Sequence, residues 1–209
     1  MHWVGMFHYE NQQWPAAKAY LGMVPKDTEY YARSRMVEGV ILTREERPVD
    51  AIAPLAAALN SARRDDTSGN TWQVANLNLA RAYYAIGNFE RAIEHFERTP
   101  RSSEFWFESM YEAAWSYFAM QRLSGALSHL QTVDSPFFDG VYHPEATLLR
   151  VLIFYYLCKY IDGQTMLADF TETHYPIADS IEKAIREAEK DPTRLFKALY
   201  AWKTERKDA

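Results

Sequence analysis

A pattern of small residues recurs along the chain at a nearly constant spacing, and it restricts the fold more than any other feature. One series of small residues is Gly5, Gly39, Ala80, Ala114 and Val151, and a second is Ala17, Ala51, Ala92, Ala126 and Gly163. In both series the successive members lie 34, 41, 34 and 37 residues apart. Five copies of one unit of about 34 residues therefore make up most of the chain.

The extra residues in two of these intervals fall where loops are expected. The surplus of seven fits the polar stretch 63–70, and the surplus of three fits 135–143, which contains Pro136 and Gly140. A large apolar residue follows each member of the second series by four positions, namely Leu21, Leu55, Phe96, Leu130 and Leu167. Small residues let two helices approach closely and large ones fill the adjoining space, so the pattern predicts stacked pairs of helices.

The unit resembles the tetratricopeptide repeat (TPR), a helix–turn–helix unit with small, aromatic and alanine positions at fixed offsets. The segment 79–89, LARAYYAIGNF, is similar to the family consensus, and copies three and four are the strongest. Departures occur at the early tryptophan position of the family, which holds Met1, Arg35, Asn76, Met110 or Thr147. The resemblance implies an all-α fold, a right-handed α-solenoid of TPR-like repeats with C-terminal capping helices.

The repeats divide the chain into two parts. About five TPR-like repeats occupy 1–176, the first of them incomplete, because Met1 already lies about four residues into a repeat. We therefore expect the chain to be a fragment of a longer protein. Residues 177–209 are expected to form two capping helices, since apolar stripes recur there at helical spacing and Asp191-Pro192 is a helix-start signal.

Composition excludes several classes of protein. The net charge of −5 gives the chain no general attraction to nucleic acid. One cysteine, Cys158, excludes an intrachain disulfide, and the longest nearly apolar run, 151–158, is too short to span a membrane. The N-terminus shows no secretory signal, so the default expectation is the cytoplasm, and the periplasm stays open if the chain is a fragment.

The residues that usually carry chemistry do not form a catalytic or metal-binding pattern. The histidines lack the i, i+4 spacing of a metal site, and His95 and His129, 34 residues apart, are predicted to occupy equivalent surface positions. Cys158 is placed at the turn of copy five, with no histidine evident beside it in the sequence to act as a base. We expect no enzyme activity, no metal and no cofactor.

The resemblance also implies a binding surface, because the family presents a concave groove lined by the first helix of each repeat. Carried over residue by residue, the predicted groove consists of Met36, Val40, Leu77, Arg81, Tyr84, Tyr111, Trp115, Phe118, Leu148, Leu152 and Tyr155. This wall is apolar and aromatic, and it suits an apolar helix or extended peptide, with Arg81 available for one acidic ligand residue. Three consecutive aromatics, Phe105, Trp106 and Phe107, form either an exposed lip or part of the core.

The expected function is a protein–protein interaction scaffold or adaptor without enzyme activity. Two alternatives stay open: a regulatory part of a larger enzyme, and a scaffold that associates with itself, so the oligomeric state is undecided. The loops 98–103 and 133–138 are similar to those of TPR-rich bacterial proteins of envelope and motility complexes. The chemistry of the predicted groove does not decide whether it is open or covered by the C-terminal helices.

Overall fold

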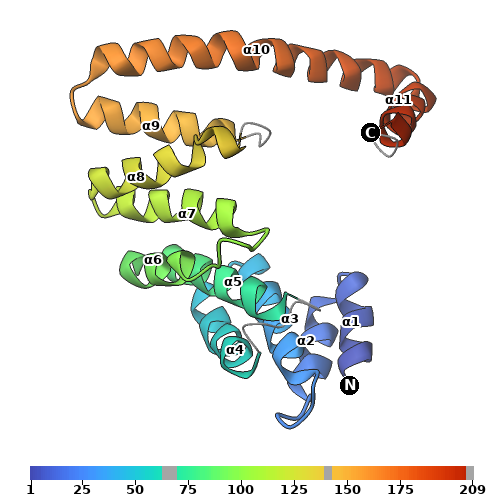
Figure 1. Ribbon diagram of the computed structural model, residues 1–209. Coiled ribbons are helices and arrows are strands. Elements are labelled where there is room, and N and C mark those ends of the chain that lie inside the picture. Colours follow the sequence, from blue (N-terminus) through green and yellow to red (C-terminus); the bar gives the residue numbers. More distant parts are fainter. Residues whose placement is uncertain (63–69, 139–142, 206–209) are drawn as a thin grey trace. The chain divides into compact units, whose positions relative to one another are not determined.

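The computed structural model describes residues 1–62, 70–138 and 143–205, and every regular element within these ranges is a helix (Figure 1). The chain forms two compact units, Met1–Val141 and Tyr142–Ala209, each of which is described by itself. The all-α fold and the solenoid architecture predicted from the sequence are confirmed.

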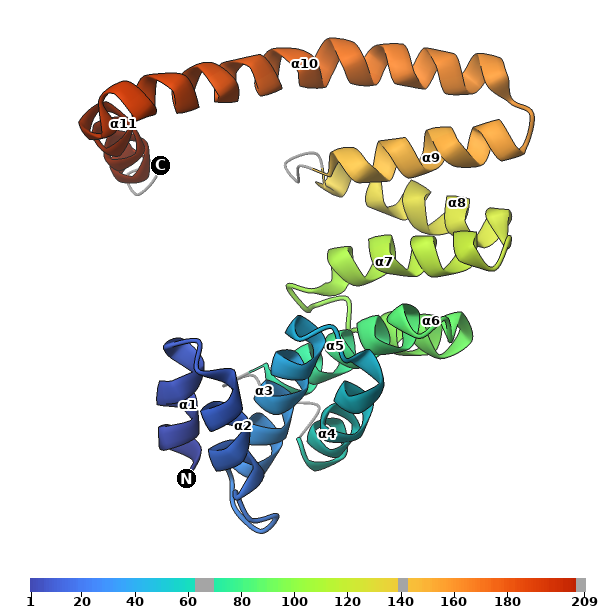
Figure 2. The same ribbon diagram turned by 180° about the vertical axis from the view of Figure 1, so that it is seen from behind.

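The first unit consists of four antiparallel helix pairs that follow one another along the chain (Figures 1 and 2). Each helix packs against the next one, and the pairs correspond to the first four sequence copies. The elements are α1 (His2–Glu10), α2 (Trp14–Gly22), α3 (Tyr31–Arg44), α4 (Pro48–Ser61), α5 (Thr71–Ala85), α6 (Phe89–Glu97), α7 (Trp106–Ala119), α8 (Leu123–Val133) and the 3₁₀ turn η1 (Pro136–Phe138).

The turns inside the helix pairs repeat the sequence period in the backbone. A residue with positive φ follows the first helix of each copy: Gln12 (57°), Glu46 (59°), Gly87 (79°), Gln121 (58°) and Cys158 (58°). These residues lie 34, 41, 34 and 37 positions apart, as the small residues do. Each donates its N–H to the carbonyl three residues earlier, as Gln121 does to Phe118 at 2.8 Å. The repeat therefore extends to the backbone even where the side chains differ.

We expect Gln121→Gly to stabilise the protein by about 0.5–1 kcal/mol. A non-glycine residue in the left-handed region costs about 1–2 kcal/mol, and glycine relieves this strain. Part of the gain is lost, because glycine has more conformational freedom in the unfolded chain. The Gln121 side chain is exposed, so little packing is lost. Urea unfolding measures the change, and Gly87→Ala at the matched turn should shift stability in the opposite direction. A destabilised Gln121→Gly would contradict this account of the turn.

The small residues lie where the helices cross. Ala17, Ala51, Ala92 and Ala126 are fully buried, and so are the large residues Leu21, Leu55, Phe96 and Leu130 that follow them. At Gly39 a Cβ atom would lie 2.4 Å from Cγ of Leu55, so the first helix of that copy has no room for one there. The predicted register is confirmed for the first four copies.

A buried polar cluster replaces part of the apolar packing in copy three. Asn76, which stands where the family usually has tryptophan, donates from Nδ2 to the carbonyl of His95 at 2.7 Å. Its Oδ1 lies 2.9 Å from Nδ1 of His95, which is 6% exposed and stacks on Tyr83. Next to them, Ser109 donates to Thr99 at 2.9 Å. The prediction of a surface position for His95 is wrong, because its ring fills this polar gap in the core.

The histidine pattern nevertheless follows the repeat. His129 occupies the equivalent place on α8, where it is half-buried and lies 4.9 Å from the ring of Tyr117. Copy one has the equivalent pair with the histidine on the first helix and the tyrosine on the second: His8 of α1 stacks on Tyr20 of α2 at 5.3 Å. A ring pair thus joins the two helices at the same level in three of the copies.

The second unit contains α9 (Pro144–Tyr156), α10 (Tyr160–Lys190) and α11 (Pro192–Glu205), with α10 packed against both of the others. The sequence predicts a new helix near Ile177, but α10 continues through Pro176 as one helix of 31 residues. Asp191 starts α11 as predicted, because its Oδ1 accepts from the N–H of Thr193 at 3.1 Å. The division into repeats at 1–176 and capping helices at 177–209 stays a proposal.

Candidate partner-binding site

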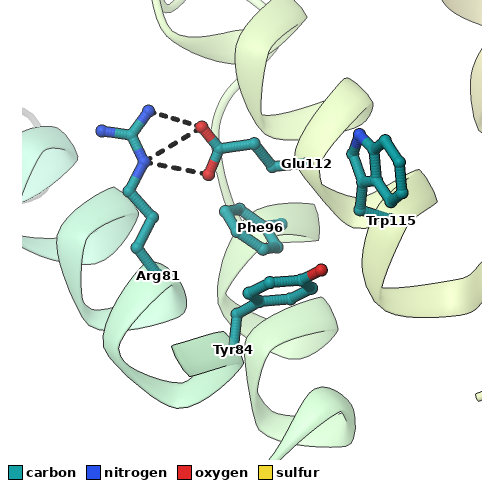
Figure 3. A pocket seen from close by; sticks show the side chains of 5 residues that line it. All are labelled: Arg81, Tyr84, Phe96, Glu112 and Trp115. Carbon is teal, nitrogen blue, oxygen red and sulfur yellow. Dashed lines mark hydrogen bonds and ion pairs between the residues drawn. The ribbon is translucent and has the colours of Figure 1, made fainter. Parts of the chain in front are cut away.

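A pocket of about 370 Å³ opens in the first unit between three successive helices (Figure 3). It is lined by Arg81 and Tyr84 of α5, Phe96 of α6, and Glu112 and Trp115 of α7. The helices α5 and α6 belong to copy three and α7 belongs to copy four, so the pocket lies at the joint between two repeats. Its volume falls within the range of about 300–1,000 Å³ that is usual for ligand pockets.

The pocket is largely apolar. Phe96 is 1% exposed and belongs to the core cluster between α5, α6 and α7, so only a small part of its ring reaches the cavity. Tyr84 is 36% exposed, and its ring meets that of Phe89 edge to face at 5.3 Å. Trp115 is half-buried and lies 6.0 Å from the ring of Phe118. These contacts hold the aromatic side chains in place before any partner arrives.

An ion cluster borders the apolar part of the pocket. Nε of Arg81 donates to both carboxylate oxygens of Glu112, at 3.0 and 2.9 Å, and Nη2 also donates to Glu112 (Figure 3). Nη2 donates to Glu108 as well. The side chains of Arg81, Glu108 and Glu112 are 34%, 44% and 22% exposed. Two carboxylates of α7 thus already bind Nε and Nη2 of Arg81, and the pairing of Arg81 with an acidic ligand residue stays a prediction.

The pocket environment shifts three pKa values. Burial raises the pKa of Glu112, and the hydrogen bond from Arg81 opposes that shift. Burial alone would lower the pKa of Arg81, but its bonds to Glu112 and Glu108 raise it overall. Burial, together with the charge of Glu112, also raises the pKa of Tyr84. The Tyr84 phenol therefore stays protonated at neutral pH and can donate a hydrogen bond.

The structure brings together three of the predicted groove residues, Arg81, Tyr84 and Trp115. Sequence reasoning missed Glu112 and Phe96, which also line the pocket. Neither residue stands at a concave position of the family pattern, so the resemblance gave no signal for them. A signal did exist for the acidic pair, since Glu108 and Glu112 are four residues apart and share one helix face.

The other predicted groove residues are dispersed. Leu77 is 3% exposed in the core with Phe96, so it fills space between helices and is not available to a partner. The residues on α3 and α7 are partly buried, whereas those on α9 of the second unit are exposed. The first group comprises Met36, Val40, Tyr111 and Phe118, and the second comprises Leu148 (45%), Leu152 (37%) and Tyr155 (64%).

The three consecutive aromatics do not form an exposed lip. Phe105 packs against the core cluster that contains Phe96. Trp106 and Phe107 each contact the ring of Phe138 in η1, with ring centroids 5.7 and 5.0 Å away. All three are half-buried, and these contacts stabilise the start of α7.

The described part of the chain offers no metal centre and no membrane-spanning helix. Its His, Cys, Asp and Glu side chains nowhere form a group of three able to hold an ion. None of its helices is both long and apolar enough to cross a bilayer. Cys158 lies exposed in the turn between α9 and α10, as the repeat register predicts. The chemistry that the pocket itself supports is apolar burial combined with hydrogen bonding and ion pairing.

Comparison with known proteins gives a consistent result. Residues 74–101 match a family model of the tetratricopeptide repeat. No significant match is found among curated protein sequences. The crystal structure of MamA is similar, with a TM-score of 0.71 at 16% identity, over 84% of this chain and 97% of that one.

Two further crystal structures are also similar to this chain. PilW, described as a type IV pilus biogenesis factor, has a TM-score of 0.65 at 18% identity, over 87% of this chain and 80% of that one. Kinesin light chain TPR-like repeats of Podosopora anserina have a TM-score of 0.62 at 16% identity, over 82% and 92% of the two chains.

Residues 74–101 therefore match one tetratricopeptide repeat, and the chain shares the α-solenoid fold of these repeat structures. The repeat matched by the family model contains α6 and most of α5, so it supplies three of the five residues that line the pocket. The repeats thus support a role in protein–protein interaction.

Proposed function

We propose that this protein is an adaptor that binds an apolar segment of a partner protein at the pocket between α5, α6 and α7. The pocket is the observation that carries this proposal: it combines apolar lining, preformed aromatic walls and a volume suited to a ligand. Aromatic residues held in a concave site are the usual anchors of protein interfaces.

The setting that we propose is a bacterial multiprotein complex. Support comes from the fold shared with PilW, whose described role is type IV pilus biogenesis, and from the loops that resemble those of bacterial envelope proteins. The observation that favours an adaptor over a catalytic role is the pairing of Arg81 with Glu112, since these groups neutralise each other and do not activate a nucleophile.

We expect Trp115→Ala to weaken partner binding by about 2 kcal/mol or more, or about thirtyfold, because truncation removes one wall of the pocket. The partner is first captured from a lysate of the native organism with the immobilised chain and then identified. Calorimetry with the purified partner then gives the Kd for the wild type and for each variant.

The matched control is Trp3→Ala, the same substitution at a side chain that is 64% exposed on α1. This variant should bind the partner as the wild type does. Equal affinities for Trp115→Ala and Trp3→Ala, with both folds intact by circular dichroism, would place the interface outside the pocket.

A further inference from the structure

The charge at the border of the pocket is negative. One guanidinium, that of Arg81, faces two carboxylates, those of Glu108 and Glu112, so the cluster as a whole carries one excess negative charge. The two carboxylates lie one helical turn apart on α7, and Glu108 is the more exposed of them, with 44% of its side chain accessible. An incoming group therefore meets a partly solvated carboxylate next to the apolar cavity.

The hydrogen bonds that Arg81 already makes also favour a cationic ligand group over an acidic one. A guanidinium has five N–H donors and no acceptor. Its Nε and Nη2 already donate to Glu112, and Nη2 also reaches Glu108. An acidic ligand that approached Nε or Nη2 would have to break these bonds, and it would be repelled by the two carboxylates. A cationic ligand group can add to the cluster without displacing any bond.

The aromatic walls of the pocket also favour a positively charged ligand group. Tyr84 and Trp115 both line the cavity, and the faces of tyrosine and tryptophan rings attract cations by about 0.5–1 kcal/mol at exposed sites. Lysine and arginine also have long apolar stems that can lie along such walls while the charged end stays in water. The pocket therefore combines an apolar interior with a border that complements a positive charge.

From this charge pattern we infer that the pocket selects a basic, apolar partner segment: one apolar side chain enters the cavity, and a neighbouring lysine or arginine pairs with Glu108. This inference rests on the proposed function, because it specifies the partner of the same pocket. It assigns to Glu108 a role in partner selection and to Arg81 the role of holding the two carboxylates in place. Electrostatic complementarity of this kind sets specificity more than total affinity.

The test uses the full chain and a set of synthetic peptides. Each peptide has twelve residues, an acetylated N-terminus, an amidated C-terminus and a fluorescein label, with a central Leu or Phe in a Ser/Gln background. The positions next to the central residue carry Lys, Gln or Glu. Fluorescence anisotropy at low and high salt measures the Kd of each peptide for the wild type, Glu108→Gln, Trp115→Ala and the control Glu94→Gln.

We expect the Lys peptides to bind about tenfold more tightly than the Glu peptides at low salt, with the Gln peptides between them. Glu108→Gln removes the excess charge and should reduce this preference to about threefold or less. Glu94→Gln makes the same change of charge on α6, where Glu94 pairs with Arg98, and should leave the preference unchanged. Trp115→Ala should weaken all peptides to a similar extent.

The outcomes separate this inference from the proposed function. Peptides whose binding depends on Trp115 but not on the sign of the flanking charge would overturn the basic selectivity and leave the proposed pocket intact. A preference for the Glu peptides would overturn the inference in the same way. Binding that ignores both Trp115 and the flanking charge, or no binding by any peptide, would contradict the inference and the pocket together.

Discussion

Acidification from pH 6.5 to pH 4 should reduce the stability of the folded protein by about 3 kcal/mol through a single buried side chain, His95. Burial, together with the charge of Arg98, lowers the pKa of His95 from 6.5 to about 4. In this range the unfolded chain therefore binds more protons than the folded one. The contribution is fully present above pH 6.5 and is lost as the pH falls toward 4.

The geometry explains why the neutral ring is preferred. His95 is 6% exposed, with its ring held between Tyr83 and the amide of Asn76. The amide donates from Nδ2 to a backbone carbonyl, so its Oδ1 is left as the acceptor for the proton on Nδ1 of the ring. A second proton would place a charge in the core, where desolvation is costly.

Urea unfolding between pH 7.5 and pH 4 measures this effect, with His95→Gln as the comparison. A glutamine side chain can still donate to Asn76 but does not titrate, so the variant should be less stable at pH 7.5 and lose less stability in acid. The difference between the two pH profiles isolates His95 from the acidic groups that titrate in both proteins. Parallel profiles would show that His95 is not the responsible group.

The second large effect is expected at a helix crossing. Ala126 on α8 is fully buried, with no exposed surface. It stands at the repeat position that Ala17, Ala51 and Ala92 occupy in the other copies. Ala126→Leu inserts three more carbon atoms between α7 and α8, and we expect it to cost about 1–3 kcal/mol or more through overpacking. Thermal and urea unfolding measure the loss.

Ser128→Leu is the matched control, because it adds the same side chain at an exposed position on the same helix. Its effect should stay within about 0.5 kcal/mol. If Ala126→Leu were as harmless as Ser128→Leu, the repeat register that places Ala126 at the crossing would be contradicted. A loss confined to Ala126→Leu would support the register in copy four.

The fold could be predicted well because its determinants are local and periodic. The burial of Ala92 and Ala126 could be predicted without knowing any distant contact, since the repeat period places a small residue at each helix crossing. The continuous helix through Pro176 was not predicted. A proline in a helix removes one N–H and usually marks an end, but the surrounding residues of α10 keep the helical pattern on both sides of it.

The candidate site was predicted only in part. Tyr84 and Trp115 follow from the family pattern, because they stand at its concave positions. The ion pairs of Arg81 could not be derived in this way, since the family pattern gives positions and not pairings, and Glu108 and Glu112 pair with Arg81 across the joint. The burial of His95 depends similarly on a partner 19 residues away, Asn76, that departs from the family consensus.

The position of the pocket has a consequence for how the site can be lost or transplanted. Arg81, Tyr84 and Phe96 come from copy three, while Glu112 and Trp115 come from copy four, so neither copy holds the complete site. In a solenoid each repeat contacts only its neighbours, so a site at the joint between two repeats depends on both of them. A chain cut between α6 and α7 would leave neither part with a complete pocket, and grafting the site onto another solenoid requires both copies together.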